Sequence, residues 1–182
     1  MRNLLKRISA LLLCLLLVLS LPVTALAEEA QDSEEGTTLR IARRQQFLDF
    51  AENCRLDSYS RNLSVILLTD IDLTGVDFSG IPIFCGNFDG NGHTVSGLSI
   101  TRNGSNMGLF RYVDASAVIQ NLTVSGAVTP DGSRSAVGGI AGHNAGKIQN
   151  CFFDGTVSGS DDVGGIAGIN AITGIIDGCH SK

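Results

Sequence analysis

Apolar residues recur along the chain in short groups at a nearly constant interval. In each group an apolar residue is followed by two other residues, an apolar residue, one other residue and a last apolar residue. The groups are Leu68/Ile71/Leu73, Val95/Leu98/Ile100, Ile119/Leu122/Val124 and Ile148/Cys151/Phe153, and another begins at Ile176/Cys179. Successive groups lie 27, 24, 29 and 28 residues apart. A period of this size indicates stacked units, none of which can bury its apolar face alone.

A second aligned set of residues lies between these groups. Its members are Met107-Gly108-Leu109-Phe110, Val137-Gly138-Gly139-Ile140 and Val163-Gly164-Gly165-Ile166. Each period therefore supplies at least two short strands, and Asn-Gly, Asp-Gly and Gly-Ser pairs mark the turns between them. Parallel coils about 4.8 Å apart would bring equivalent residues into contact. The pattern predicts an all-β solenoid of four to five coils over residues 63–182.

Small and polar residues also fall at equivalent positions of the repeat. Gly126 and Gly155 follow their groups at the same distance, where a tight corner or a close backbone approach requires glycine. Asn121 and Asn150 precede the central apolar residue, where an amide can bond the backbone of a turn or of the next coil. We interpret both asparagines as structural rather than ligand-binding.

The segment 39–62 has a different pattern. The apolar stretch LRIA is followed by Phe47, Phe50, Ala51 and Cys54 at helical spacing. The first coil of a solenoid needs a cover because its apolar face and unpaired backbone groups would otherwise meet water. We therefore predict an N-terminal cap made of one strand and one short helix.

Both ends of the chain carry features that are separate from the repeat. Residues 1–27 combine basic residues, an apolar run and the small-residue site Ala25-Leu26-Ala27, which is typical of a signal peptide. Residues 28–38 are acidic and lack large apolar side chains, so they predict a disordered leader. The sequence stops inside the fifth group. We interpret this as a C-terminally truncated solenoid that continues into further domains in a longer chain.

Charge narrows the range of partners. Removal of residues 1–27 leaves 10 basic and 18 acidic residues, a net charge of −8. A chain this acidic does not favour nucleic acid as a partner. No second apolar run is long enough to span a membrane after the signal peptide. The remaining length suits one domain with its own core.

The repeat resembles that of a known family. GLFR at Gly108 and GIAG at Gly139 and Gly165 are similar to the short signature of the GLUG-repeat family, and LLTDIDLTG and FDGNGHTVSGLSI resemble its entry coils. Ala141 and Ala167 replace a bulkier residue of the signature. The resemblance implies a right-handed, pectin-lyase-like parallel β-helix in an exported bacterial surface protein, adhesin-like or part of the non-catalytic region of an immunoglobulin A peptidase.

Candidate catalytic residues are few. The HExxH motif of zinc peptidases is missing, and His93, His143 and His180 lack partners at metal-ligand spacing, so we expect His143 in an exposed turn and His93 facing outward. Paired carboxylates could support polysaccharide cleavage at Asp70 with Asp72 or at Asp161 with Asp162. We expect the first pair to flank inward-facing Ile71 on the solvent face and the second to form an acidic loop. No catalytic, cofactor or metal site is predicted.

Four cysteines follow the predicted signal peptide, at positions 54, 85, 151 and 179. An exported chain permits disulfides, and four thiols allow three complete pairings. Cys151 and Cys179 occupy one slot of adjacent coils, which places their α-carbons within bridging distance. Side chains stacked in parallel favour two buried thiols over a bridge, and that is our prediction.

The combined pattern predicts a non-catalytic exported solenoid that serves as a cell-surface spacer or an adhesive surface. Binding would use an outer face and loops such as Asn103–Asn106 and Pro130–Arg134. Host or cell-surface glycans or proteins are the expected partners. The alternative is a carbohydrate-active enzyme, a polysaccharide lyase or hydrolase, because β-helices also carry such sites.

Overall fold

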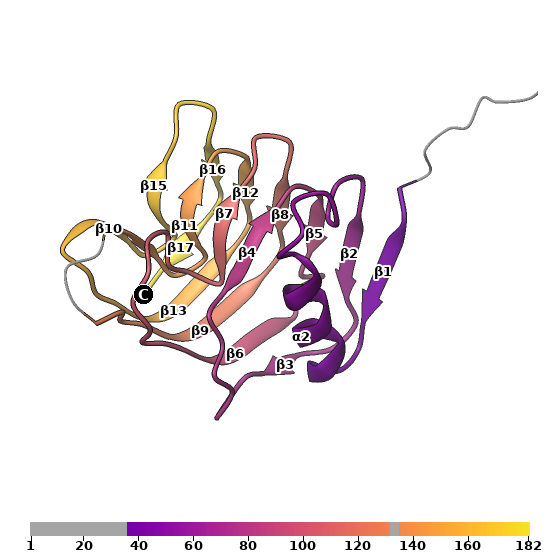
Figure 1. Cartoon of the computed structure of the whole chain (residues 1–182), viewed down its shortest axis with the longest axis horizontal. Helices are drawn as coiled ribbons and strands as arrows, with labels where there is room; N and C mark the ends of the chain where they lie inside the picture. Colours follow the sequence, from indigo (N-terminus) through magenta and orange to yellow (C-terminus); the bar gives the residue numbers. More distant parts are fainter. Residues whose placement is uncertain (1–35, 132–134) are drawn as a thin grey trace, which may run out of the picture. The chain divides into compact units, whose positions relative to one another are not determined.

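The computed structural model describes residues 36–131 and 135–182. The predicted signal peptide 1–27, most of the predicted leader 28–38 and part of the candidate loop Pro130–Arg134 lie outside the described residues. Within them, the chain winds as a parallel β-solenoid of about five turns (Figure 1). No helix in these residues is long and apolar enough to cross a membrane.

Three parallel sheets run along the solenoid. Each of the first four coils contributes one strand to all three in turn, and the last described coil contributes to the first two (Figure 1). The first contains β1 (Thr38–Ile41), β2 (Ser64–Leu67), β5 (Asn87–Asp89), β8 (Val118–Gln120), β12 (Lys147–Gln149) and β16 (Ile175–Asp177). The second contains β3 (Ile71–Asp72), β6 (Thr94–Ile100), β9 (Thr123–Val128), β13 (Phe152–Val157) and β17 (His180–Ser181). The third contains β4 (Ile81–Phe84), β7 (Phe110–Val113), β11 (Ala141–Asn144) and β15 (Ala167–Asn170). A short pair, β10 (Ser135–Gly138) with β14 (Asp161–Gly164), joins the later coils.

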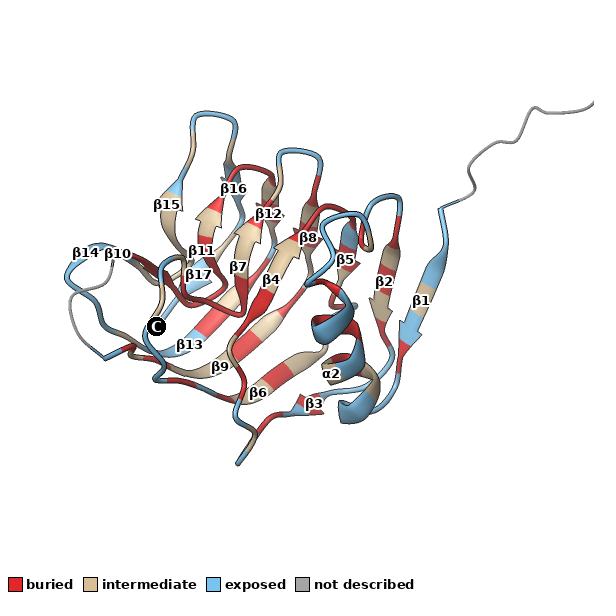
Figure 2. Ribbon diagram, viewed as in Figure 1, coloured by how far each residue is buried: buried red, intermediate tan, exposed pale blue. Residues whose placement is uncertain are grey.

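The interior is a continuous column of equivalent side chains. Phe88, Ile119 and Ile148 occupy one slot of successive coils and are each 0% exposed. Leu122 and Cys151 are also buried, and the Phe152 N–H donates to the Leu122 carbonyl across the same step. In Figure 2 the buried residues recur as red bands on the strands of successive coils. The stacking of apolar positions predicted from the sequence is therefore confirmed.

A short helix, α2 (Arg44–Asn53), packs against the first strands of the solenoid beside β1 (Figure 1). Phe47, Phe50, Ala51 and Cys54 point inward as their spacing predicted. The ring of Phe50 lies 6.0 Å from the rings of both Phe84 and Phe88, measured between centroids. The helix thus fills the interior at the N-terminal end, and its rings pack against the first two coils.

The predicted alignment of the first two groups is wrong by one strand. Ile71 pairs with Val95, and Val95 pairs with Val124, the last residue of its group rather than the first. The cause is a bulge in β6, where the register shifts between Val95 and Leu98 and Gly97 has φ +69°. The group Val95/Leu98/Ile100 therefore lies within the single bulged strand β6, whereas Ile119/Leu122/Val124 spans β8, a corner and β9. Both groups show the same apolar spacing. Leu68, placed in the core by the pattern, is 40% exposed.

Corners between the first and second sheets require left-handed backbone. Asn121, Asn150 and Gly178 follow one another in adjacent coils with φ of 53°, 51° and 59°. Asparagine and glycine tolerate this region best. The two asparagines are structural because of their backbone conformation, and the Asn121 amide bonds the Asp89 carboxylate of the preceding coil rather than backbone.

Candidate functional site

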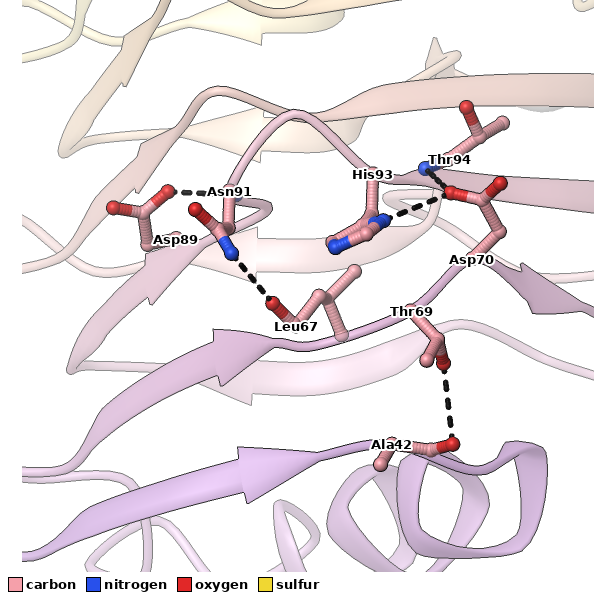
Figure 3. Close-up of polar contacts among 8 residues, drawn as sticks. All are labelled: Ala42, Leu67, Thr69, Asp70, Asp89, Asn91, His93 and Thr94. Atoms are coloured by element: carbon pink, nitrogen blue, oxygen red, sulfur yellow. Dashed lines mark hydrogen bonds and ion pairs between the residues drawn. The ribbon is translucent and has the colours of Figure 1, made fainter.

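Asp70 and His93 come from adjacent coils and meet where the chain turns from the first sheet into the second (Figure 3). The Asp70 Oδ1 lies 3.1 Å from the His93 Nδ1 and accepts the Thr94 N–H at 2.9 Å. The Thr94 hydrogen bond, followed by the one from His93, lowers the pKa of the Asp70 carboxyl. The Asp70 side chain is 71% exposed and that of His93 31%. This corner is a surface contact between an ionised carboxylate and an imidazole.

Asp72 uses its carboxylate for a different turn. Its Oδ1 accepts the Thr74 N–H at 2.8 Å, and hydrogen bonding from Thr74 lowers the pKa of the Asp72 carboxyl. Ile71, between the two aspartates, is 1% exposed, so the predicted outward placement of both is confirmed. Because both pKa values are lowered, neither carboxyl is tuned toward the protonated form that a general acid needs at neutral pH.

Asp89 organises the neighbouring turn. Its Oδ1 accepts the Asn91 N–H at 2.7 Å, and its Oδ2 accepts the Gln120 side-chain amide at 3.0 Å. The Gln149 amide donates to the Gln120 side-chain oxygen at 2.6 Å, so the row continues into the next coil. These contacts tie consecutive coils together along the outer face of the first sheet.

The other predicted carboxylate pair lies elsewhere. Asp161 and Asp162 open strand β14 and are exposed, so the predicted acidic loop is wrong. Asp162 has φ 50°, which turns its side chain out of the alternation of a regular strand. His180 lies exposed in β17. The structure therefore does not bring these residues to the Asp70 corner.

The sequence context of His143 suggested an exposed turn, and that prediction is wrong. His143 lies in β11, where it pairs with Tyr112 of β7 in register. The two rings stack with centroids 4.8 Å apart and planes 12° apart. Ile83 and Ile169 continue the row on either side. The third sheet thus carries a row of flat and aliphatic side chains across four coils.

A groove with a volume of about 410 Å³ runs beside this row. Its lining residues are Pro82, Ile83, Asn106, Arg111 and Tyr112. The Arg111 Nη2 donates to the Ser105 carbonyl at 3.1 Å, while its Nε is buried and has no hydrogen-bond partner. The groove therefore combines an aliphatic floor, an aromatic wall and a guanidinium with donors to spare.

A second hollow of about 350 Å³ lies between α2 and residues 76–82. Its charged and polar lining groups already bond one another or near neighbours. The Gln45 amide donates to Asp49 at 2.8 Å, the Arg55 guanidinium to Glu52 at 2.7 Å, and Asp77 pairs with Arg102. This hollow offers fewer unused polar groups than the groove at Arg111.

Cys151 and Cys179 occupy the same slot of adjacent coils as free thiols, as predicted, but only Cys151 is buried and Cys179 is half-buried. Each thiol contacts the carbonyl two residues before it and a carbonyl one coil back, so the side chains run parallel. Burial raises the pKa of the Cys151 thiol to about 12. Cys54 and Cys85 are also free and buried.

Sequence reasoning named Asn106 but missed Arg111 and Tyr112. The aligned set of Met107-Gly108-Leu109-Phe110 holds at Met107, which bridges to Val137, but Phe110 pairs with Ala141 instead of Ile140. One inserted residue therefore hides the Tyr112–His143 pairing. In the other candidate loop, Pro130 is buried, so the Pro130 side chain itself cannot contribute to a binding surface. In residues 36–131 and 135–182, no three His, Cys, Asp or Glu side chains lie together as a metal site.

Comparison with known proteins finds the GLUG motif at residues 133–158. Halomucin of Haloquadratum walsbyi is 40% identical over 142 residues, which cover 72% of this chain and 2% of halomucin. A protein of Evansella cellulosilytica described as a Gly-rich membrane protein is 33% identical over 96 residues, which cover 46% of this chain and 11% of that protein. The chain thus spans a small part of these relatives. No solved structure matches it.

Proposed function

We propose that this chain, which carries a GLUG motif within a parallel β-solenoid, is an exported, non-catalytic surface module that acts as a spacer or an adhesive surface. The observation that carries the proposal is the filled interior. Buried apolar side chains continue from Phe47 in the cap to Phe153 in the fourth coil. A ligand would therefore meet the outer strand faces and loops.

The names of the relatives support a place at the cell boundary. One is a halomucin and the other a Gly-rich membrane protein, which fits a cell-surface or membrane-associated module. Stacking itself suits a spacer, because each added coil lengthens a solenoid by about 4.8 Å without a new core design.

A glycan array and a host-protein pull-down with the purified chain test the adhesive role. We expect retention of at least one glycan or protein class through the outer face. If neither assay returns a ligand, the adhesive role is wrong and the spacer role remains. Small-angle scattering then tests the spacer, which requires a rigid solenoid of constant length in solution.

The Asp70–His93 contact favours one second candidate, a carbohydrate-active enzyme. A carboxylate 3.1 Å from an imidazole can position a proton-transfer group at the surface. Turnover of uronate or neutral polysaccharides that is lost in Asp70→Asn and retained in the control Asp161→Asn would support the enzyme and overturn the non-catalytic proposal.

A further inference from the structure

We propose that the groove formed by Pro82, Ile83, Asn106, Arg111 and Tyr112 is a binding site for acidic oligosaccharides, in which the carboxylate of a uronic-acid-type sugar pairs with Arg111. The inference rests on the proposed adhesive role and names its site and ligand class. The groove volume of about 410 Å³ lies within the range of small-ligand sites, about 300–1,000 Å³.

Tyr112 supplies an aromatic wall. His143 covers one face of the ring, with the two rings nearly parallel at 4.8 Å. The partner of Tyr112 in the preceding coil is Ile83, a shorter side chain that lines the same groove. Tyr112 and Ile83 both line the groove, so the part of the ring that extends past the shorter Ile83 side chain borders it. The apolar C–H face of a pyranose fits such a wall.

Arg111 supplies an unpaired cation. Its guanidinium has five N–H donors, and its contact with the Ser105 carbonyl uses one of them. No carboxylate in the described part of the chain forms an ion pair with it. Gly80 leaves room for its stem, since a Cβ there would lie 2.9 Å from the Arg111 Cγ. The cation is thus held in place, and its geometry suits a carboxylate.

Asn106 favours a sugar over an acidic peptide. Asn106 lines the groove, and an asparagine side chain offers both a donor and an acceptor, which matches hydroxyl groups that also do both. An acidic peptide side chain would use the donors alone and would leave the aromatic wall without a matching ring. A uronate presents the carboxylate, the hydroxyls and the apolar ring face together.

Calorimetric titration of the purified chain with tetragalacturonate, and with the same oligosaccharide after reduction of its carboxyl groups, tests the proposal. We expect Arg111→Gln to weaken tetragalacturonate binding at least tenfold, because it removes a charge-assisted contact, and to leave the weak binding of the reduced sugar unchanged. Tyr112→Ala should weaken both sugars, whereas Tyr112→Phe should retain both. The matched control is Arg40→Gln, an exposed arginine on the outer face of β1.

Amide chemical-shift mapping on the unmodified chain keeps the test valid if a variant fails to fold. Shifts caused by tetragalacturonate should centre on residues 82–83 and 106–112. The inference is overturned if the reduced sugar binds equally well, if Arg111→Gln binds normally, or if a polyglutamate peptide competes at equal concentration. In each case the adhesive proposal survives on another ligand or face. It fails separately if the array and the pull-down return nothing.

Discussion

Single residues at the corners decide whether the coils can stack. Asn121, Asn150 and Gly178 share one left-handed slot, and the sequence revealed the asparagine alignment without the backbone conformation behind it. The sequence does not reveal that conformation, because an asparagine can also occupy a turn for the hydrogen bonds of its side chain. The alignment could be predicted from spacing, whereas the dihedral angle depends on how β8 and β12 turn into the second sheet.

Replacement of Asn150 measures the free-energy cost of the left-handed backbone conformation with little change in packing, because the Asn150 side chain is exposed. Asn150→Ala should lower the free energy of unfolding by about 1 kcal/mol, since a Cβ-bearing residue without a polar side chain disfavours φ near +51°. Asn150→Gly should keep or raise stability. Urea unfolding of the two variants gives the comparison, and equal losses in both would show that the amide rather than the backbone matters.

The buried thiols predict a loss of stability in alkali. Burial raises the pKa of Cys54 and of Cys151 to about 12, from an ordinary value of 9.0. The folded state therefore keeps the proton that the unfolded chain releases above pH 9. Stability is fully present below pH 9 and is lost progressively up to pH 12, at up to about 1.4 kcal/mol per pH unit for each thiol.

Urea unfolding at pH 8 and at pH 10.5 measures this effect. Cys151→Ala should be less stable than the unmodified chain at pH 8 but should show a smaller drop between the two pH values. An unchanged drop would mean that Cys151 does not contribute to the alkaline transition. The exposed Asp70, with a lowered pKa, acts at the other extreme, where its contribution is lost as the pH falls through its folded pKa.

At the level of elements, the helix and the fourth and fifth coils could be predicted, and the register of the first two coils could not. Helical spacing of Phe47 and Phe50 is a local signal that tertiary contacts reinforce. The β6 bulge adds one residue to a strand without a change in the apolar spacing. The stretch Val137–Ala141 is one residue longer than its partner stretch Met107–Phe110, and this insertion hid the pairing of Tyr112 with His143 from the sequence alignment.

Because α2 packs against the first two coils, we expect the stability of the fold to depend strongly on Phe50. The ring is 1% exposed and lies 6.0 Å from Phe84 and from Phe88. Phe50→Ala should lower the free energy of unfolding by about 3–5 kcal/mol, because it leaves a cavity between the helix and the first coils. Phe50→Leu should cost less. Leu56→Ala, at a side chain that is 67% exposed, is the control and should change little.

At the scale of the whole molecule, burial declines toward the last coil. Val137 and Ile148 are 0% exposed, whereas Val163 and Ile175, which lie in the last strands of their respective sheets, are 45% and 53% exposed. A solenoid is stabilised chiefly by contacts between neighbouring coils, so a coil with one neighbour should open more easily. The N-terminal end differs because α2 covers it.

Hydrogen exchange should therefore show a gradient along the axis. We expect the amides of β14 to β17 to exchange at least tenfold faster than those of β8, β9 and β11, and those of β2 and β5 to resemble the middle coils. Exchange measured by mass spectrometry on proteolytic fragments gives the comparison. Uniform protection along the chain would contradict this dependence on neighbours.

The equivalence of successive rungs has a consequence for how such a chain can change its length. Ile119 and Ile148, like Val124 and Phe153, are partners one coil apart and 29 residues apart in sequence. An in-frame duplication of that 29-residue segment would place each residue of the new copy one coil after its own identical counterpart. The rod would grow by one step, and the cap and the groove at Arg111 would keep their surroundings.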